Sequence, residues 1–583
     1  MIPLHRVSQT AIRAAAQRWL EQDPDPDTRA ELQQLLDAAG SIEPHGITIA
    51  EDDDTPHAQA WRELRDRFST RLSFGTAGLR GRQAAGPNRM NRVTVGQAAR
   101  GFADFLLTRA ERDGTGTPTV VIGYDARVNS DVYAHDTAEL MQAAGVNATL
   151  LPRMMPTPVL AFAVRHLNAS AGVMVTASHN PKWDNGYKVY LGGDDHGSQI
   201  VPPSDGEIAA AIERVANHQL LNELPRDAGY EIADESVIDA YVAETAKVLR
   251  GRFDAEQLAN FKVVYTPLHG VGWDTYRRVL AACGIPEPAV VAEQIEPDGS
   301  FPTVDFPNPE EPGALDLAYA KADEVGANLV IAHDPDADRL AVALQDVHGQ
   351  WQRLGGNDIG KFLGWRAAEA AKAAGTGGTL ATSLVSSPAM SRVAQAYDLD
   401  YVETQTGFKW ISRADGIIFG YEEALGYLVD PDKVRDKDGI SAAVAMLDLA
   451  IWLAGEGRTL HSLDDEFAER FGAFSSRQVS VRFDEPNQLG STMSRLREQP
   501  PTEIGGVPVA EFFDFETAAE PANILRIRLA DDTRIMVRPS GTEPKIKSYI
   551  DAASSEGSVA QRRASAEQRA DAAAAAMRAV LLG

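Results

Sequence analysis

A serine lies directly beyond an apolar run in the stretch AGVMVTASHNPKWDNGYKVY. Residues 171–175 have the composition of a strand, and the Ser-His-Asn-Pro cluster that follows predicts a loop. Ser178 is therefore placed just beyond a strand end, where its hydroxyl can reach a ligand. Because most loop serines only cap helices or satisfy backbone groups, Ser178 needs the support of other motifs before it counts as a functional residue.

Three aspartates, Asp334, Asp336 and Asp338, follow a second apolar run in NLVIAHDPDADRLAVAL. The intervening proline forbids a helix, and in an extended loop alternate side chains point to one side. Three convergent carboxylates repel one another unless a hard cation lies between them, and Mg²⁺ prefers oxygen ligands. A calcium EF-hand is excluded, because its sixth position needs Gly and its twelfth Glu, where the chain has Arg339 and Gln345. Coordination positions left open by three carboxylates could take a phosphate oxygen.

The stretch RIMVRPSGTEPKIKSYI contains Arg538, Ser540, Gly541 and Thr542 in one short loop between strands. A guanidinium, two hydroxyls and closely approaching backbone amides are the ingredients of a phosphate cradle. An ordinary hairpin with a Ser-Gly-Thr turn is the structural alternative.

A glycine-rich loop, FGTAGLRGR, carries Arg80 and Arg82. It does not match the dinucleotide-binding fingerprint, because Thr76 and Ala77 stand where the second glycine should fall, so NAD binding is not inferred. The loop either holds phosphate or is a flexible basic turn.

Glu422 and Glu423 lie together in FGYEEALGYLVDPDKVRDKDGI and are followed by Arg435 and Lys437. Paired acids are usually solvated surface, but carboxylates also bind sugar hydroxyls. The stretch is therefore a candidate for sugar recognition.

Two different sequence patterns indicate the strands and helices that position these motifs. Three β-branched runs, TVVIGYDAR, FKVVYTPLHG and TLATSLVSS, end in Gly, Ser or His loops and alternate with alanine-rich helical stretches, a pattern typical of βαβ units. After about residue 475, alternating apolar and polar residues and a turn at Asp531 and Asp532 predict an antiparallel sheet, followed by a final helix. We expect a helical N-terminal extension, residues 1–68, packed on the first domain. Three similar α/β domains with mixed sheets are expected over residues 69–230, 231–350 and 351–474, and a C-terminal α+β domain over residues 475–583.

Composition restricts the class of protein. The chain has 583 residues, 44% of them hydrophobic, and a formal net charge of -27, which disfavours nucleic acids and anionic membranes as partners. A single cysteine excludes an intramolecular disulfide and a cysteine-rich zinc site. The first residues have no apolar core of signal-peptide length, and no stretch reaches roughly 18 uninterrupted apolar residues. We expect a cytoplasmic protein.

Taken together, the motifs resemble those of the α-D-phosphohexomutase family, the phosphoglucomutases and phosphomannomutases. TASHNP is similar to the family's phosphoserine loop, DPDADR to its DGDGDR metal loop, GYEEALG to its GEES-type sugar-binding loop, and RPSGTEPK to its C-terminal phosphate loop. All four occur in the family's order over about residues 70 to 550. The resemblance implies four domains around a central cleft.

The resemblance also implies roles for individual residues. Ser178 would bear and transfer the phosphoryl group, and the three aspartates would bind Mg²⁺ together with that phosphoserine. Further active-site residues would be His179, Lys188, Arg80 and Arg339. Positions that match the family's substrate and phosphate contacts are Thr76, Gly407, Lys409, Glu422, Ala424, Arg435, Arg538, Ser540, Gly541 and Thr542.

The chain departs from the family pattern at several positions. Ala77 replaces the serine of GTSG, Ala424 replaces the serine of GEES, and Pro335 and Ala337 replace the glycines of DGDGDR. The TPVLAFAVRHL segment, the Glu-Glu-Ala-Leu-Gly loop and the long N-terminus resemble the branch that contains phosphopentomutases and glucose 1,6-bisphosphate synthases.

The expected reaction interconverts glucose 1-phosphate and glucose 6-phosphate through a phosphoserine and a bound 1,6-bisphosphate, which also primes the enzyme. Mannose or pentose phosphates are alternative substrates, and a sugar-phosphate sensor without catalysis or a phosphatase are more remote alternatives. Lys188 and His179 both stay open as the group that transfers the proton, and a monomer or a homodimer is expected.

Overall fold

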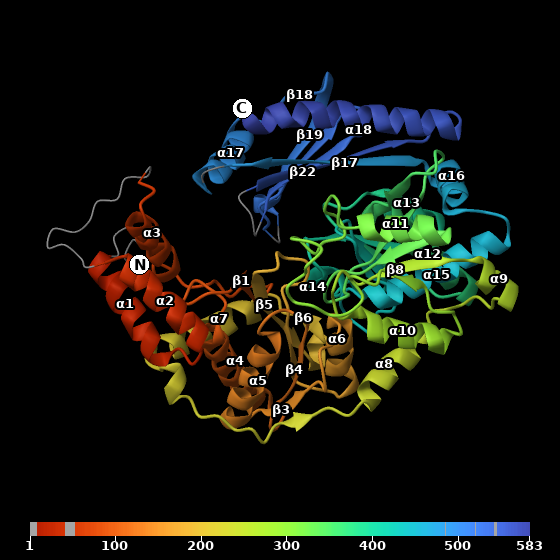
Figure 1. Cartoon of the computed structure of the whole chain (residues 1–583). Helices are drawn as coiled ribbons and strands as arrows, with labels where there is room; N and C mark the ends of the chain where they lie inside the picture. The colour runs from red at the N-terminus through yellow and green to blue at the C-terminus, as the bar shows by residue number, and fades with distance from the viewer. Residues whose placement is uncertain (1–7, 41–52, 484–485, 519–520, 541–544) are drawn as a thin grey trace. The chain divides into compact units, whose positions relative to one another are not determined.

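The computed structural model describes residues 8–40, 53–483, 486–518, 521–540 and 545–583. The chain forms two compact units. Unit 1 comprises residues 1–249, 262–353 and 432–444, and unit 2 comprises residues 250–261, 354–431 and 445–583. Each unit contains two sheets with their helices (Figure 1).

Three helices begin the described chain: α1 (Gln9–Gln22), α2 (Pro26–Ala38) and α3 (Pro56–Phe68). The DPDPD stretch separates the first two, because the side chain of Asp25 caps α2 and Pro26 occupies its first turn, where the missing N–H costs no hydrogen bond. Trp19 and Trp61 from these helices join Val93 of the first α/β region in one buried apolar cluster. The N-terminal helices therefore share a core with the region that follows them.

The first sheet of unit 1 has seven strands in the order β1-β5-β4-β2-β3-β7, with β6 paired to β5. Strands β4, β2, β3 and β7 are parallel, whereas β5 pairs antiparallel with β4, β1 and β6. The strands are β1 (Leu79–Arg82), β2 (Thr119–Tyr124), β3 (Asn147–Leu150), β4 (Ala171–Val175), β5 (Asp184–Leu191), β6 (Ser198–Gln199) and β7 (Glu231–Ile232). The helices are α4 (Arg92–Asp113), α5 (Ser130–Ala144), α6 (Thr157–His166) and α7 (Ser204–His218). Every residue of β4 is buried, as expected for a strand of a parallel sheet covered on both faces.

The second sheet of unit 1 has five strands in the order β12-β11-β10-β8-β9. Its first three strands in sequence are parallel, and β11 and β12 extend it antiparallel. The strands are β8 (Val263–Thr266), β9 (Ala289–Val290), β10 (Leu329–Ala332), β11 (Ala341–Gln345) and β12 (Trp351–Arg353). The helices are α8 (Ser236–Ala246), α10 (Gly272–Cys283) and α11 (Asp316–Val325).

Unit 2 contains a mixed four-stranded sheet in the order β14-β13-β15-β16, of which only β16 is antiparallel. The strands are β13 (Thr379–Ser383), β14 (Asp400–Thr404), β15 (Ile417–Glu422) and β16 (Gly426–Leu428). The helices in this part of the chain are α9 (Ala255–Asn260), α12 (Gly356–Ala374), α13 (Ala389–Ala396), α14 (Phe408–Ile411), α15 (Gly439–Gly455) and α16 (Leu460–Phe471). Helix α15 begins in unit 1 and continues into unit 2.

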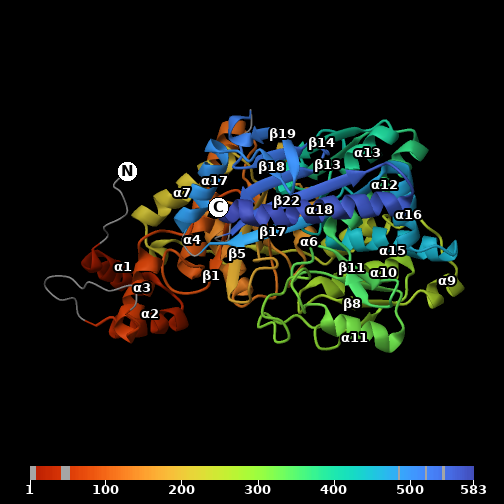
Figure 2. The same cartoon turned by 90° about the horizontal axis from the view of Figure 1, so that it is seen from above.

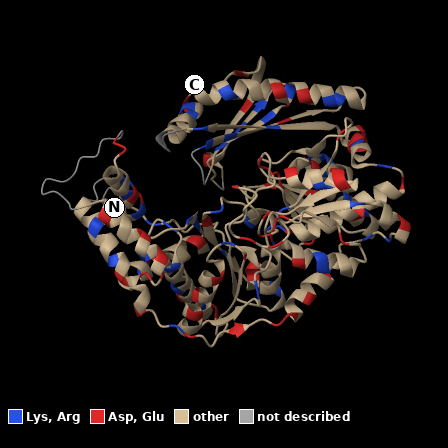
Figure 3. Cartoon of the chain, in the orientation of Figure 1, with Lys and Arg blue, Asp and Glu red and all other residues tan. Residues whose placement is uncertain are grey.

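The second sheet of unit 2 is antiparallel throughout, in the order β17-β22-β21-β20-β19-β18. The strands are β17 (Ala473–Arg482), β18 (Glu503–Ile504), β19 (Val507–Asp514), β20 (Leu525–Leu529), β21 (Arg534–Pro539) and β22 (Lys545–Ser554). The helices are α17 (Pro486–Glu498) and α18 (Val559–Leu582), and α18 runs along the sheet over β17 and β22 (Figure 2). Acidic and basic residues are interspersed along α18 (Figure 3).

The predicted fold class is confirmed: three regions have mixed sheets and the C-terminal region has an antiparallel sheet with helices. The predicted turn at Asp531 and Asp532 joins β20 to β21. The βαβ pattern predicts the parallel strands. It does not predict the antiparallel strands that extend the sheets at their edges. Within the described residues no single helix is long and apolar enough to cross a membrane, and only the bent pair α15 and α16 reaches that length and composition when counted together.

Candidate active site

Ser178 lies in the loop that follows β4, at the carboxyl edge of the parallel strands of the first sheet. Its backbone adopts a left-handed conformation, with φ at 52°, which residues with a Cβ rarely adopt. The loop turns here because the Ser178 N–H donates to the Thr176 hydroxyl, with 2.9 Å from N to Oγ1. The side chain is 3% exposed, so the hydroxyl is directed into the protein and not into solvent.

The Ser178 hydroxyl contacts two groups that could take part in chemistry. It donates to Asp334, with 2.9 Å from Oγ to Oδ2, and its Oγ lies 3.2 Å from Nδ1 of His179. The first and second sheets of unit 1 thus bring the predicted nucleophile and the first predicted metal ligand into hydrogen-bonding contact. Sequence separation between the two residues is large, and the sequence alone places them together only through the family resemblance.

The three aspartates after β10 converge, as the alternation in an extended loop predicts. Asp334, Asp336 and Asp338 are fully buried, and one carboxylate oxygen from each lies within 4.8 Å of the others. Oδ1 of Asp336 and Oδ1 of Asp338 are buried without a hydrogen-bond partner among the described residues. Buried carboxylate oxygens in need of a partner are suited to a hard divalent cation, so the residues present fit Mg²⁺.

Cationic side chains surround this triad. The Lys188 ammonium lies 2.7 Å from Oδ2 of Asp336 and 2.9 Å from Oδ2 of Asp338. The Lys437 ammonium lies 3.3 Å from the same oxygen of Asp338. Arg339 approaches the triad less closely, with its Nε 3.8 Å from Oδ2 of Asp334.

The charges of the cluster shift the pKa values of its members in different directions. Burial, together with the carboxylates of Asp336 and Asp338, raises the pKa of Asp334 well above its ordinary value. Burial also raises the pKa of Asp338, but the ammonium groups of Lys188 and Lys437 outweigh it and hold that pKa below its ordinary value. The protein therefore disfavours a third negative charge at Asp334 unless a cation offsets it.

Two candidates for proton transfer differ in charge. Burial lowers the pKa of Lys188, but the carboxylates of Asp336 and Asp338 outweigh it, so the pKa lies above its ordinary value and the side chain stays charged. Burial and the positive charges of Arg339 and Arg80 hold the pKa of His179 well below its ordinary value. The imidazole is therefore neutral near pH 7 and can accept a proton.

The FGTAGLRGR loop reaches the nucleophile through Arg80. Strand β1 pairs antiparallel with β5, and Arg80 donates to the side chain of Asn180, two residues after Ser178, with 3.3 Å from Nη1 to Oδ1. Thr76 lies in the tight turn that two backbone hydrogen bonds close between Gly75 and Gly78.

Arg435 and Lys437 belong to unit 1, in the segment before α15. The neighbouring Asp436 accepts hydrogen bonds from Tyr190 and Gln199, with 2.9 and 2.7 Å to its Oδ2. These contacts fix the backbone that presents Lys437 to Asp338.

The residues predicted to hold the sugar and the second phosphate lie in unit 2. Glu422 is the last residue of β15 and is 8% exposed, and Ala424 lies in the turn to β16. Gly407, with φ at 112°, precedes α14, which carries Lys409. Arg538 lies near the end of β21 and Ser540 follows that strand. The predictions for Gly541 and Thr542 lie outside the described residues.

Glu423 anchors the turn between β15 and β16 through its side chain. Its Oε2 accepts hydrogen bonds from the hydroxyls of Ser383 and Ser386, at 3.1 and 3.0 Å. The second glutamate of the pair is therefore held by Ser383 at the end of β13 and by Ser386 in the loop that follows.

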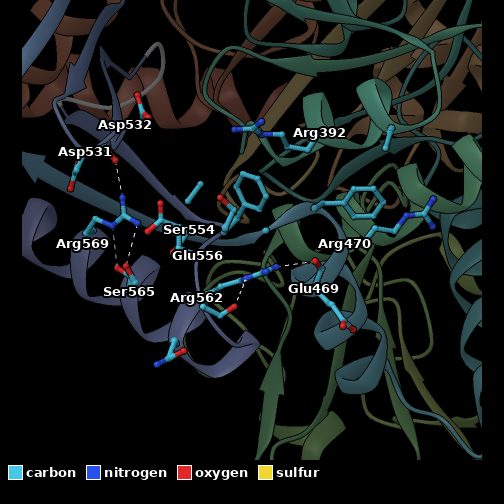
Figure 4. A pocket seen from close by; sticks show the side chains of 18 of the residues that line it. Arg392, Glu469, Arg470, Asp531, Asp532, Ser554, Glu556, Arg562, Ser565 and Arg569 are labelled. Carbon is cyan, nitrogen blue, oxygen red and sulfur yellow. Dashed lines mark hydrogen bonds between the residues drawn. The ribbon is translucent and has the colours of Figure 1, made fainter.

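A cavity of about 1030 Å³ in unit 2 is lined by parts of α13, α16 and α18 and by the turn between β20 and β21 (Figure 4). None of the described residues that line it belongs to the predicted site. Arg562 donates to the carbonyl oxygens of Ala468 and Glu469, and Arg569 donates to that of Asp531. These guanidinium groups join helix α18 to its neighbours, which is a structural role.

Comparison with protein-family models identifies four successive regions of the chain. They match phosphoglucomutase/phosphomannomutase alpha/beta/alpha domain I over residues 71–219, domain II over 239–349, domain III over 356–471, and the C-terminal domain over 496–568. The chain belongs to the phosphoglucomutase/phosphomannomutase family. Enzymes of this family are phosphosugar mutases, isomerases that transfer a phosphoryl group within a molecule, and the family is metal-dependent.

Relatives in the phosphoglucomutase/phosphomannomutase family carry different substrate names. A "Probable phosphomannomutase" from Haemophilus influenzae is 52% identical, over 79% of this chain and 93% of the relative. A phosphoglucomutase from Staphylococcus haemolyticus is 36% identical, over 83% and 90%, and a phosphopentomutase from Mus musculus is 32% identical, over 92% and 89%. A solved structure of a family protein from Burkholderia thailandensis shares the fold, with a TM-score of 0.63 at 20% identity, over 86% of this chain and 97% of that one.

Sequence reasoning did not connect two residues, Thr157 and Lys437, with the three aspartates, although the stretch predicted to recognise sugar contains Lys437. The Thr157 hydroxyl at the start of α6 donates to Asp336, with 2.6 Å from Oγ1 to Oδ2, and its N–H donates to the Asp336 carbonyl. Lys437 meets Asp338. The TPVLAF stretch and the basic run after residue 430 were visible signals, but nothing in either indicates that it meets the metal loop.

Proposed function

We propose that the chain interconverts glucose 1-phosphate and glucose 6-phosphate through a phosphoserine at Ser178. The observation that carries the proposal is the hydrogen bond of 2.9 Å between the Ser178 hydroxyl and Asp334, made from a buried, left-handed loop residue beside three convergent carboxylates. A serine with only a structural role has no need of such surroundings. The arrangement is suited to a side chain that carries a phosphoryl group and passes it on.

The reaction proceeds in two transfers. The bond between the phosphorus and Oγ of phosphorylated Ser178 breaks as a bond forms from that phosphorus to the free hydroxyl of the sugar phosphate. That hydroxyl gives up its proton and Oγ of Ser178 takes one up, which leaves a bound 1,6-bisphosphate and a free serine hydroxyl. After the bisphosphate has reoriented, its other phosphoryl group returns to Ser178. The same bisphosphate, supplied from outside, primes the unphosphorylated enzyme.

His179 is the better candidate to exchange a proton with Oγ of Ser178 as that oxygen leaves in the first transfer and attacks in the second. Its imidazole is neutral, because burial and two arginines lower its pKa, and it lies 3.2 Å from Oγ of Ser178. Lys188 keeps its proton and contributes positive charge near the transferring group. The cations Arg339 and Lys437 add to this electrostatic stabilisation.

Asp334, Asp336 and Asp338 would hold Mg²⁺, which when bound offsets negative charge on the transferring phosphoryl group. Glu422, Gly407 and Lys409 would contact the sugar, and Arg538 and Ser540 the phosphate that is not reacting. These assignments follow the family's motifs.

A second candidate function changes only the sugar. The relative that is 52% identical is named a phosphomannomutase, and another that covers 92% of this chain is named a phosphopentomutase, which favours mannose or pentose phosphates as substrates to be tested. Ala424 removes a hydroxyl at a position expected to contact the sugar. We therefore expect the residues around Glu422 and Ala424 to decide the preferred substrate.

The test is a comparison of initial rates for glucose 1-phosphate, mannose 1-phosphate and ribose 1-phosphate, each with Mg²⁺ and a trace of glucose 1,6-bisphosphate. Ser178→Ala should abolish turnover with every sugar, and Ser491→Ala, which changes an exposed hydroxyl on α17, should leave it unchanged. Preference for another sugar would rename the substrate and leave the mechanism in place. If protein shown by intact mass to be phosphorylated isomerised none of them, the mutase proposal would fail; release of inorganic phosphate instead would indicate a phosphatase.

A further inference from the structure

Arg127, three residues beyond the end of β2, donates to four backbone carbonyls of the loop that carries Ser178. Its Nη2 lies 2.7 Å from the carbonyl oxygen of Ser178 and 2.5 Å from that of Asn180. Its Nη1 lies 2.8 Å from the carbonyl oxygen of Pro181 and 3.0 Å from that of Asp184. One planar guanidinium thus gathers the carbonyl groups of a seven-residue stretch that has no helix and pairs as a strand only at its last residue.

The guanidinium is itself held rigidly. Both its side chain and that of Asp125 are fully buried, and the Arg127 Nε lies 3.6 Å from Oδ2 of Asp125. Asp125 is fixed in turn, because its Oδ1 accepts hydrogen bonds from the Ser130 hydroxyl and the Arg127 N–H. The guanidinium carbon also lies 5.1 Å from the centre of the Phe301 ring, within the range of a cation–π contact.

The backbone conformation of Ser178 indicates why Arg127 binds the carbonyl groups of this loop. A left-handed residue with a Cβ is strained, and such strain persists only where surrounding contacts determine the backbone. The Ser178 carbonyl, fixed by Arg127, and the Ser178 N–H, fixed by Thr176, together set the direction of the side chain. That direction brings Oγ to Asp334.

We propose that Arg127 is a positioning residue that holds the nucleophile loop in the conformation in which the Ser178 hydroxyl meets the metal-binding carboxylates. Its contacts are to backbone atoms, so it acts through Ser178 and not on the substrate. Because a guanidinium fork can serve several carbonyls at once and an ammonium cannot keep that geometry, lysine is a poor replacement. The inference rests on the proposed function only for its kinetic consequence, since the loop conformation can be measured without any substrate.

The experiment compares Arg127→Met and Arg127→Lys with Arg92→Met. Arg92 is a matched control, because its guanidinium makes a two-pronged ion pair with the buried Asp136 in the same unit, with both contacts at 2.7 Å. Among the described residues, its hydrogen bonds and ion pairs do not involve the nucleophile loop. Hydrogen exchange of the loop amides between residues 176 and 184, thermal stability, kcat and KM are measured for each. Magnesium and a trace of glucose 1,6-bisphosphate are present in the kinetic assays.

Arg127→Met should lower kcat by about 100-fold or more while KM changes little, because a displacement of the nucleophile by about 1 Å costs on that order. Loop exchange should become faster in both Arg127 variants, and Arg127→Lys should retain part of the activity. Arg92→Met should lose thermal stability but keep wild-type kcat and loop exchange. If Arg127→Met fails to fold, Arg127→Lys and its loop exchange carry the test.

Wild-type kcat and loop exchange in a folded Arg127 variant would overturn the proposal, as would a fall in kcat no larger than that of Arg92→Met at equal loss of stability. An inactive wild-type enzyme would instead count against the proposed function. In that case the exchange rates of the loop still decide whether Arg127 positions Ser178.

Discussion

Acidification should weaken the fold of unit 1, and His333, a buried histidine next to the metal loop, contributes a measurable share. His333 is fully buried, its Nδ1 lies 3.0 Å from the Tyr265 hydroxyl oxygen, and its Nε2 lies 3.1 Å from the carbonyl oxygen of Gly439. Burial lowers the pKa of His333 from 6.5 to about 4, although the Gly439 carbonyl and Asp438 act in the opposite direction. The folded protein therefore keeps this imidazole neutral at pH values where the unfolded chain protonates it.

The sign and size of the effect follow from proton linkage. Between the folded and unfolded pKa values, 4 and 6.5, the unfolded state binds more protons, so the free energy of unfolding falls as the pH falls. Well above pH 6.5 the neutral histidine costs no stability, and the loss in free energy of unfolding grows as the pH falls. At pH 4 this loss reaches about 3 kcal/mol, because a tenfold change in an ionisation constant is worth about 1.4 kcal/mol. From pH 7.5 to about pH 5.5 the expected loss is roughly 1.3 kcal/mol.

The assay compares urea unfolding of the wild type and His333→Gln at pH 7.5 and at about pH 5.5, which keeps the protein above its isoelectric point of about 4.9. The glutamine amide can still donate to Gly439 but does not titrate, so the variant should lose about 1.3 kcal/mol less than the wild type on acidification. His348→Gln, in an exposed turn between β11 and β12, should behave like the wild type. Equal pH dependence in His333→Gln and the wild type would refute the reasoning.

Three further predictions concern the site. Asp336→Asn should raise the Mg²⁺ concentration needed for half-maximal rate at least about tenfold and lower kcat, and an unchanged magnesium titration would remove Asp336 from the metal site. Ser178→Gly and Ser178→Ala should both be inactive, but calorimetry should find the glycine variant more stable by about 1 kcal/mol, because glycine accepts the left-handed backbone; equal stability would contradict the strain at φ 52°. Glu423→Gln should raise KM several-fold and leave kcat nearly unchanged, because the turn that carries the proposed sugar contact loses the carboxylate bound by Ser383 and Ser386. Steady-state kinetics with an unchanged KM would argue against that role of Glu423.

The sequence predicts the ends of the strands that carry chemistry. Continuous apolar runs become the buried strands β4 and β10, and the polar residues that follow them, Ser178 and Asp334, lie at the carboxyl edges of parallel strands. The alternation of the aspartates is also local, because it depends only on an extended loop that proline keeps out of a helix. Family motifs then supply the juxtaposition of the two loops, which no local pattern contains.

Residues that act through tertiary contacts were beyond local prediction. Thr157 and Lys437 lie 179 and 99 positions from the aspartates they contact, and their side-chain types are common in helix starts and basic loops. Arg127 differs from Thr157 and Lys437, because a local pattern does indicate where it lies. It follows the apolar run TVVIGY at the same distance at which Ser178 follows AGVMV. Since β2 and β4 are neighbouring parallel strands, their carboxyl ends meet at one edge, and a long cation beyond one strand can reach the loop beyond the other.

Local charge, and not the net charge of the chain, decides whether an anionic substrate can bind. The chain carries a formal net charge of -27, and yet Lys188, Lys437, Arg339 and Arg80 gather around three buried carboxylates. Four cations against three acids leave an excess of one positive charge before any divalent cation binds, and the added charge of Mg²⁺ makes the cluster more positive toward a phosphoryl group on Ser178. Replacing Lys188 or Lys437 should therefore weaken phosphoryl transfer more than it weakens the fold. The negative charge of the carboxylates can still be offset by Mg²⁺ or reduced by a proton on Asp334. The transferring phosphoryl group, in contrast, loses a positive charge that stabilises it.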